Sequence, residues 1–261
     1  GDTVYRYSSS ARYNETIWDG GGNDTIRIDG NAASLIDLTP GSWSQLGMPL
    51  TYSERDLNTL AVTQARPDLT DARTVFIYDT VLIENGIGGG GNDQLIGNYA
   101  ANRLSGGGGS DRLFGGAGDD TYFFTSDSGS DTIVDRVMNG ASPIAGDAGS
   151  DLIEFDVGFS LSNLTVTQAT GTNNLSIKYT AGYTITVVDF FATDEAKVEA
   201  IQFADGLVVS LASLFISTSA TAVNGTEGDD FLTGRTSTSS GDTLQGGLGN
   251  DVLSGLAGSD I

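Results

Sequence analysis

The chain has 261 residues, of which 12 are Lys or Arg and 34 are Asp or Glu, so its formal net charge is −22. A surface this acidic repels nucleic acid and anionic membranes, and neither is expected as a partner. The chain contains no His and no Cys, which excludes imidazole catalysis, His-ligated zinc, Cys–His nucleophiles and disulfide bonds. Its longest apolar stretch, residues 207–216, is about half the length of a membrane-spanning helix, so no transmembrane segment is predicted.

Residues 1–87 predict a β-rich segment. Apolar runs at residues 25–28 and 74–83 lack a helical period, which favours strands. Residues 19–27 (DGGGNDTIR) form a solitary glycine-rich nonamer. Residues 42–71 are polar and irregular, so we expect them to form an excursion on the surface.

Residues 88–123 consist of four consecutive nonamers with the pattern Gly-Gly-x-Gly-x-Asp-x-apolar-x. This nonapeptide is typical of parallel β-helices that bind calcium in RTX proteins. The glycines permit a tight turn with positive φ, and the last three residues predict a short strand with one inward side chain. The predicted inward side chains are Leu95, Leu104, Leu113 and Tyr122.

Two nonamers form one coil if equivalent residues recur every 18 positions, because 2 × 9 = 18. Asp93 and Asp111 have this spacing, as do Asn102 and Asp120. Stacked carboxylates repel one another unless a hard divalent cation lies between the turns. Calcium fits best, because it accepts six to eight oxygen ligands in a flexible geometry. Ordering so many glycines around a narrow core loses much entropy, so we expect folding to be coupled to calcium binding.

Residues 124–222 predict a second β-rich segment. Residues 129–133 and 146–153 echo the nonamer. Three later segments alternate apolar and polar residues, as half-buried strands do: 164–168, 175–179 and 183–189. Residues 193–200 predict a short helix and residues 204–206 a turn.

Residues 223–261 predict a second array, which ends in a truncated nonamer. Three extra residues within 234–245 account for the spacing of 21 between Asp230 and Asp251. The predicted inward side chains are Leu232, Leu244 and Leu253. The predicted fold is therefore all-β: a parallel β-roll in two arrays, separated and capped by strand-rich segments. Its predicted domains are residues 1–87, 88–123, 124–222 and 223–261.

Residues 1–5 (GDTVY), 17–25 and 81–85 resemble the C-terminal calcium-binding region of serralysin-type proteins, a branch of the RTX proteins exported by type I secretion. Residues 129–214 resemble the haemolysin-type calcium-binding-related module that often separates RTX arrays. The resemblance implies a secreted, extracellular or cell-surface protein whose partners are calcium and the type I secretion machinery. The zinc motif of the family's peptidases is absent, so this segment is predicted not to be an enzyme.

The resemblance also implies calcium ligands: backbone carbonyls at repeat positions two and four, and the position-six side chains of successive coils. One implied site uses Gly89, Gly91, Asp93, Gly107, Gly109 and Asp111. A second uses Asn98, Ala100, Asn102, Gly116, Gly118 and Asp120. In the later array, Thr226, Gly228 and Asp230 face Gly247, Gly249 and Asp251, while Asp242 faces Asp260. Asp19, Gly21 and Asp24 match an isolated upstream site of the family.

Other interpretations of these motifs are weaker. Gly86, Gly88 and Gly91 match a dinucleotide fingerprint only formally, because no βαβ unit surrounds them. Acidic pairs such as residues 119–120 fit a metal ligand beside a solvated neighbour better than glycosidase acids. We expect four aromatic residues to cap the ends of the core rather than form a sugar platform: Trp18, Trp43, Phe190 and Phe191.

Three functions stay open at this point. The leading one is a calcium-responsive module that folds outside the cell. The second is a calcium-rigidified part of a surface layer or adhesin, with self-assembly as its hallmark. The third is an accessory C-terminal domain of a secreted metallopeptidase or other hydrolase.

Overall fold

A computed structural model describes most of the chain. The described residues are 1–55, 62–136, 138–139, 142–143, 149–169, 171–179, 182–192 and 198–211, with the strands at 222–224, 231–233, 243–245 and 252–254. Within these residues the regular structure is almost entirely β, with one short 3₁₀ turn, η1 (Leu161–Asn163). None of the described residues form a helix that is long and apolar enough to cross a bilayer.

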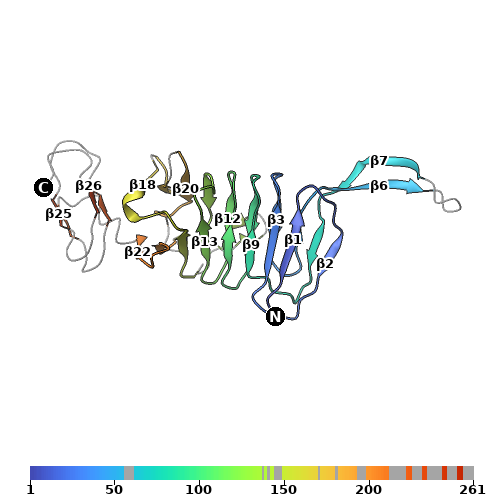
Figure 1. The fold of residues 1–261 in the computed structure, drawn as a ribbon, viewed down its shortest axis with the longest axis horizontal. Coiled ribbons are helices and arrows are strands. Elements are labelled where there is room, and N and C mark those ends of the chain that lie inside the picture. The colour runs from blue at the N-terminus through green and yellow to red at the C-terminus, as the bar shows by residue number, and fades with distance from the viewer. Residues whose placement is uncertain are drawn as a thin grey trace.

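Two long sheets form the body of the molecule (Figure 1). The eight-stranded sheet contains, in spatial order, β1 (Val4–Ser8), β3 (Thr25–Asp29), β9 (Asn85–Ile87), β11 (Arg103–Ser105), β13 (Thr121–Phe124), β17 (Leu152–Phe155), β21 (Ala200–Gln202) and β22 (Val208–Ser210). The seven-stranded sheet contains β18 (Thr165–Gln168), β19 (Leu175–Lys178), β20 (Thr184–Val187), β14 (Asp131–Ile133), β12 (Arg112–Phe114), β10 (Gln94–Ile96) and β4 (Leu35–Asp37).

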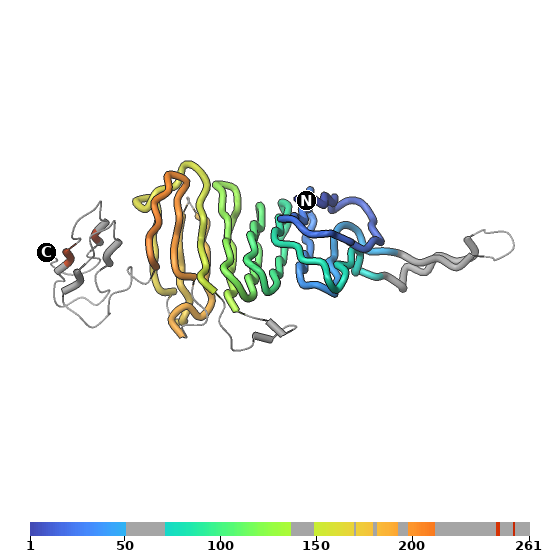
Figure 2. The backbone as a smooth tube through the Cα atoms, turned by 90° about the horizontal axis from the view of Figure 1, so that it is seen from below, coloured from blue at the N-terminus to red at the C-terminus, as the bar shows by residue number. Residues whose placement is uncertain are grey.

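The four nonamers alternate between the two sheets. Each contributes one strand at its x-apolar-x triplet, as predicted: β10, β11, β12 and β13. Gln94 pairs in parallel with Arg112, and Arg103 pairs with Thr121, so both registers advance by two nonamers per coil. The backbone follows a regular coil through this part of the molecule (Figure 2). The predicted all-β fold and its parallel roll are confirmed.

The roll continues on both sides of the first array. Before the array, β3 pairs with β9 and β4 pairs with β10. After it, β12 pairs with β14 and β13 pairs with β17, so the two echoes of the nonamer form coils of the same roll. The sheets therefore continue without interruption past residues 87 and 123. The domain boundaries predicted at these positions mark changes in the sequence pattern, and strand pairing continues across them.

A single apolar ladder fills the space between the sheets. The predicted inward side chains Leu95, Leu104, Leu113 and Tyr122 are fully buried. Side chains from the flanking coils, such as Ile26, Ile36, Ile133 and Ile153, extend the same cluster. Because each short strand points only one or two side chains inward, the core is narrow and grows only by adding coils.

The N-terminal excursion is more regular than expected. β2 (Glu15–Ile17), β8 (Val75–Ile77) and β5 (Trp43–Ser44) form a three-stranded sheet. β6 (Leu50–Arg55) and β7 (Val62–Asp71) form an antiparallel hairpin that projects from the end of the roll (Figure 1). Residues 42–71 were predicted as a surface excursion, and the hairpin within them projects as one; the antiparallel pairing of β6 with β7 was not predicted, because no periodic pattern in the sequence indicates it.

Strands of the later segments agree with the alternating patterns. β18, β19 and β20 form an antiparallel meander, and residues 204–206 turn between β21 and β22 with a positive φ of 90° at Gly206. The helix expected at 193–200 is wrong at its end, where Ala200 begins β21, while residues 193–197 lie outside the described residues. A short pair, β15 (Met138–Asn139) and β16 (Ser142–Pro143), lies between β14 and β17 in the chain.

The predicted aromatic caps divide into two kinds. Phe190 is buried in the core. Trp18 instead is 65 % exposed and stacks on Tyr78 with ring centroids 3.7 Å apart, and Trp43 is also exposed beside Phe76. The prediction that both tryptophans close the core was therefore wrong, because Ile17 and Val75 occupy that inner face.

The described strands near the C-terminus pair in parallel. β23 (Ala222–Asn224) pairs with β25 (Thr243–Gln245), and β24 (Phe231–Thr233) pairs with β26 (Val252–Ser254). Leu232 pairs with Leu253, 21 residues later, which agrees with the predicted spacing of two nonamers plus three inserted residues. Leu244 is buried, whereas Leu253 is 47 % exposed and does not follow the inward prediction.

Candidate metal-binding sites

The turns of the roll form two rows, one at each edge of the sheets. The first row precedes strands of the seven-stranded sheet and includes residues 88–93, 106–111 and 125–131. The second row precedes strands of the eight-stranded sheet and includes residues 97–102 and 115–120. Repeat positions two and four of the last two nonamers have positive φ, as predicted: Gly107 (86°), Gly109 (123°), Gly116 (109°) and Gly118 (100°).

Aspartates of the first row form a hydrogen-bonded ladder along the edge of the roll. Oδ1 of Asp93 accepts from the backbone N–H of Ser34 at 2.7 Å, and Oδ1 of Asp111 accepts from the N–H of Asp93 at 2.7 Å. Oδ1 of Asp131 continues the series by accepting from the N–H of Asp111 at 2.8 Å. Each carboxylate thus joins its own coil to the preceding one.

The second row repeats this arrangement. Oδ1 of Asp120 accepts from the N–H of Asn102 at 2.7 Å, and Oδ1 of Asp151 accepts from the N–H of Asp120 at 2.7 Å. Glu199 ends the row by accepting from the N–H of Asp151 at 2.6 Å. Glu84 accepts from the N–H of Asp24 at 2.7 Å in the earlier coils.

Sequence reasoning missed four members of these rows: Glu84, Asp131, Asp151 and Glu199. Asp131 is the first residue of a strand of the roll, and each of the others immediately precedes one. The echoes at 129–133 and 146–153 contained the signal for two of them, because an acid begins the strand motif in both. The other two lack the glycine pattern, and only strand pairing places them in register.

Several of these buried carboxylates have an oxygen without a partner. Asp111, Asp120, Asp131 and Asp151 each retain one buried oxygen that makes no hydrogen bond within the described structure. Burial, together with the charge of neighbouring carboxylates, raises the pKa of Asp111 and of Asp120 to about 8, and burial raises the pKa of Asp131 to about 7. A buried anion with an unmet oxygen is unfavourable, and a cation between the turns removes the penalty.

Glycine carbonyls line the same turns. The carbonyl oxygens of Gly89, Asn98 and Gly109 accept N–H groups from the next coil at 2.8, 3.0 and 3.2 Å. A Cβ at Gly107 would overlap the carbonyl oxygen of Gly89, and one at Gly109 would overlap that of Gly91. Successive turns therefore stack with carbonyls against Cα atoms, so side-chain and backbone oxygens of neighbouring coils lie close together. This set of hard oxygen donors fits calcium.

The first glycine of each repeat has a separate role. A Cβ at Gly106 would overlap the carboxylate of Asp111 and lie 2.6 Å from its Cβ, and a Cβ at Gly115 would overlap the carboxylate of Asp120. Neither glycine has a positive φ in the range that disfavours other residues. Room for the aspartate, rather than turn geometry, thus requires glycine at position one.

The isolated upstream motif is only partly assembled. Oδ1 of Asp19 accepts from the N–H of Gly21 at 2.8 Å, and its other oxygen accepts from the hydroxyl of Tyr5. Asp24 instead joins the second row, where its Oδ1 accepts from the N–H of Thr3 at 2.7 Å. The predicted ligands of the later array lie outside the described residues: Thr226, Gly228, Asp230, Asp242, Gly247, Gly249, Asp251 and Asp260.

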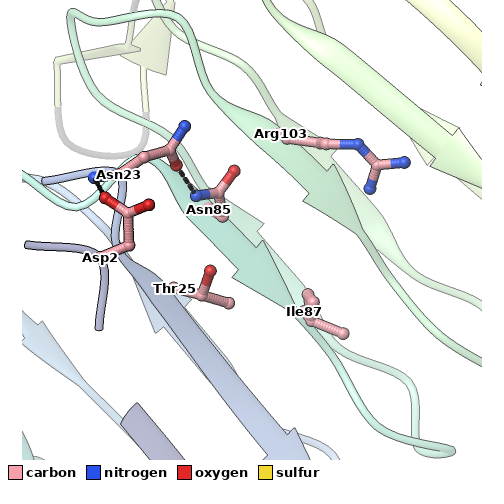
Figure 3. A pocket seen from close by; sticks show the side chains of 6 residues that line it. All are labelled: Asp2, Asn23, Thr25, Asn85, Ile87 and Arg103. Atoms are coloured by element: carbon pink, nitrogen blue, oxygen red, sulfur yellow. Dashed lines mark hydrogen bonds between the residues drawn. The ribbon is translucent and has the colours of Figure 1, made fainter. Parts of the chain in front are cut away.

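A hollow of about 290 Å³ lies on the outer face of the eight-stranded sheet (Figure 3). Its lining residues are Asp2, Asn23, Thr25, Asn85, Ile87 and Arg103. Asn23 receives a hydrogen bond from Asn85 and donates its backbone N–H to Asp2, so these polar groups satisfy one another. Arg103 pairs with Glu154 and covers the ring of Phe123, which leaves no set of convergent groups for a ligand in this hollow.

Two family models match the chain. The RTX calcium-binding nonapeptide repeat matches residues 11–27, 87–122 and 236–261 in four copies. The haemolysin-type calcium binding protein related domain matches residues 174–213. The first match covers both rows of turns in the first array, where orphaned carboxylate oxygens lie.

Known proteins are similar over part of the chain. Metalloprotease AprA of Pseudomonas entomophila and Serralysin G of Dickeya chrysanthemi are each 35 % identical over 117 residues, which is 40 % of this chain and 20 % of each relative. The Serralysin of Proteus mirabilis is 34 % identical over 117 residues. The chain thus spans about a fifth of these relatives.

A solved structure, the extracellular lipase LipA from Serratia marcescens, aligns with a TM-score of 0.31 at 22 % identity, over 65 % of this chain and 28 % of that one. The sequence matches carry the assignment. The chain is a calcium-binding segment that contains RTX nonapeptide repeats and a haemolysin-type calcium-binding-related domain, and it is similar to serralysin-type proteins.

Proposed function

We propose that this segment is a calcium-responsive folding module of a bacterial protein secreted by the type I route. The observation that carries the proposal is the pair of buried position-six carboxylates, Asp111 and Asp120, each with an orphaned oxygen beside stacked backbone carbonyls. Calcium supplies positive charge between successive turns. The chain's own residues then hold the coils in register through the Asp111 and Asp120 ladder bonds.

The first implied site is formed by Gly89, Gly91, Asp93, Gly107, Gly109 and Asp111, and the second by Asn98, Ala100, Asn102, Gly116, Gly118 and Asp120. Adjacent turns bring both sets together. Asn102 removes one negative charge from the second set while keeping an oxygen, so the second site has lower affinity. Asp131 and Asp151 extend the two rows beyond the repeats and act in the same way.

Because the calcium concentration is low inside a cell and high outside, the module folds only after export. With many buried carboxylates and a net charge of −22, the calcium-free chain repels itself and stays unfolded during export. Outside, each ion that binds only the folded state adds stability, about 2.7 kcal/mol at 100 times its dissociation constant. Several sites together decide whether the roll forms.

We infer further that the whole protein is a secreted metallopeptidase or another hydrolase, to which this segment is an accessory domain without catalysis of its own. One of the named relatives is a metalloprotease and the others are serralysins, and the matched region includes calcium-binding repeats. A calcium-rigidified element of a surface layer or adhesin is the second candidate. Calcium-dependent assembly seen by light scattering favours that second candidate, and a monodisperse calcium-bound chain opposes it.

The direct test is a calcium titration of the metal-free chain, followed by far-UV circular dichroism and Trp fluorescence, with magnesium as the control. A cooperative gain of β structure that is specific for calcium is expected. A chain that is already folded without calcium, with a spectrum unchanged on titration, overturns the proposed switch.

A further inference from the structure

Three buried carboxylates meet beneath the second row of turns: Asp120, Asp135 and Asp151. One oxygen of each lies within 4.8 Å of the others. All three side chains are at least 98 % buried, and each has an oxygen that makes no hydrogen bond. Asp120 and Asp151 are members of the second row, and each lies immediately before a strand of the roll. Asp135 belongs to neither row, and no strand of the roll begins directly after it.

Asp135 occupies a glycine position of the coil. Thr132 pairs with Arg112, which pairs with Gln94, so the residues three places later are also equivalent. Asp135 is therefore level with Gly115 and Gly97, the first glycines of their repeats. At Gly97 the space where a side chain would begin is filled by the Asn102 side chain and the carbonyl oxygen of Gly115. At Gly115 it is filled by the Asp120 carboxylate and the Tyr122 hydroxyl. The coil at Asp135 instead places a third carboxylate there.

A second departure from the repeat lies next to the first. Tyr122 stands where the preceding coil has Leu104, with which it pairs. Its buried hydroxyl donates to Oδ1 of Asp135 at 2.7 Å, a bond that a leucine cannot make. The two departures thus depend on each other, and together they fix the Asp135 carboxylate so that its other oxygen is free for the cluster.

We propose that Asp120, Asp135 and Asp151 bind one calcium ion through their side chains, with Tyr122 as the residue that positions Asp135. Oxygens that coordinate calcium at about 2.4 Å lie no more than about 4.8 Å apart, as these do. The first row provides a contrast within the same molecule, since no third carboxylate joins Asp111 and Asp131 among the described residues. The proposal rests on the proposed calcium function but adds a ligand that the nonapeptide pattern lacks.

The alternative occupant is a proton, shared between two of the carboxylates. The two occupants predict opposite behaviour for D135N, which removes one charge and keeps an oxygen for the Tyr122 hydroxyl. With an ion in the cluster, D135N binds one of its calcium ions several-fold more weakly than the unmodified chain does. With a shared proton, D135N binds all its ions with unchanged affinity, which overturns the proposal.

The measurement is equilibrium dialysis of the full chain with radioactive calcium, over a range of free calcium concentrations up to saturation and in matched ionic strength. D205N is the control, because exposed Asp205 lies in the turn before β22 and makes the same charge change away from the cluster. An unmodified chain that binds no calcium removes the proposed function itself. An unmodified chain that binds calcium, with no loss of affinity in D135N, removes only the Asp135 site.

A second variant covers the case in which D135N does not fold. Y122F keeps all three carboxylates and removes only the phenol hydroxyl beside them. Terbium replaces calcium in this experiment, and excitation of tyrosine sensitises its emission at short range. We expect Y122F to bind the same number of terbium ions but to show weaker tyrosine-sensitised emission. Unchanged emission places no ion beside Tyr122 and overturns the proposal.

Discussion

The carboxylate at repeat position six serves two needs at once. Its Oδ1 accepts a hydrogen bond from a backbone N–H of the preceding coil, as Asp111 does from Asp93. This N–H is buried in the turn and has no backbone carbonyl as its partner. In Asp111 and Asp120 the second oxygen remains buried without a partner and is available to a cation. Asn102 joins the coils differently: its Oδ1 accepts from the N–H of Asn98 in its own repeat, while its amide Nδ2 donates to the carbonyl oxygen of Glu84 in the preceding coil. Its amide carries no charge to offer a cation.

Asp111→Asn separates these two needs. The amide oxygen still accepts from the N–H of Asp93, while the charge that binds calcium is lost. We expect the calcium midpoint of folding to rise several-fold, with no loss of stability in the calcium-free chain, since a buried anion is removed as well. Circular dichroism titrations of D111N, D205N and the unmodified chain measure the midpoints. Equal midpoints for the two variants contradict the assignment of Asp111.

Gly106 tests the space required by the carboxylate. Gly106→Ala places a methyl group against the Asp111 side chain, including its Cβ, so the aspartate must move out of the turn. We expect a loss of about 1–3 kcal/mol in the free energy of unfolding with calcium bound. Gly20→Ala is the matched control, because nothing lies within 4 Å of its added Cβ and its φ is not positive.

Urea unfolding in saturating calcium measures both glycine variants. Gly20→Ala is expected to remain within about 0.5 kcal/mol of the unmodified chain. Similar losses for the two variants would show that the glycines are needed for backbone freedom rather than for the space beside Asp111.

At the scale of elements, the roll is defined by strand register and not by the nonamer. β14 pairs in register with β12, although the chain between them is longer than in the repeats. β17 pairs with β13 and β21 with β17 across connections that are longer still, again in the same sheet. An inward apolar residue and a preceding acid are enough to continue the coil, because extra residues leave the roll at the turns.

The β6–β7 hairpin is an excursion of this kind. Its two strands pair only with each other among the described strands. We expect that replacing residues 51–70 by an Asn-Gly turn between Leu50 and Asp71, which already pair across the hairpin, leaves the roll intact. The calcium midpoint should stay the same and the free energy of unfolding should change by less than about 0.5 kcal/mol.

Calcium titration and urea unfolding of the shortened chain, beside the full chain, check this prediction. A raised calcium midpoint would show that the hairpin helps to hold the three-stranded sheet, β2–β8–β5, against the roll.

At the scale of the whole molecule, the buried carboxylates couple folding to pH. Without metal, the folded state holds protons on Asp111 and Asp120 up to about pH 8 and on Asp131 up to about pH 7, whereas an unfolded aspartate loses its proton near pH 4. Between these values the folded state binds more protons, so its stability falls as pH rises. The calcium-free roll should therefore be more stable at pH 5 than at pH 8.

Calcium reverses this dependence, because the ions bind the deprotonated carboxylates. Far-UV circular dichroism at pH 5 and pH 8, in metal-depleted buffer and in saturating calcium, measures both trends. We expect acid to increase the β signal only when calcium is absent. A β signal that increases with pH in metal-depleted buffer contradicts the raised pKa values of the buried aspartates.

The local pattern of the sequence was sufficient for the repeated part of the roll. The fixed nonamer period predicted the strands from β10 to β13, their inward side chains and the spacing of Asp93 with Asp111, because each coil repeats the same short-range geometry. The residues proposed as ligands in the first array lie in adjacent turns for the same reason. The tryptophan environments and the regular β6–β7 hairpin were not predictable, because both depend on pairing between strands that share no period.

The sequence by itself therefore determined the calcium chemistry, the all-β class and the coil of two nonamers. Tertiary structure alone decided that the roll continues past residue 123, that Asp131, Asp151 and Glu199 join the two rows, and that Asp135 meets Asp120 and Asp151. The physical reason is the variable length of chain between successive coils. Parallel strands accept any connection long enough to return to the same edge, so sequence spacing no longer reports which carboxylates become neighbours.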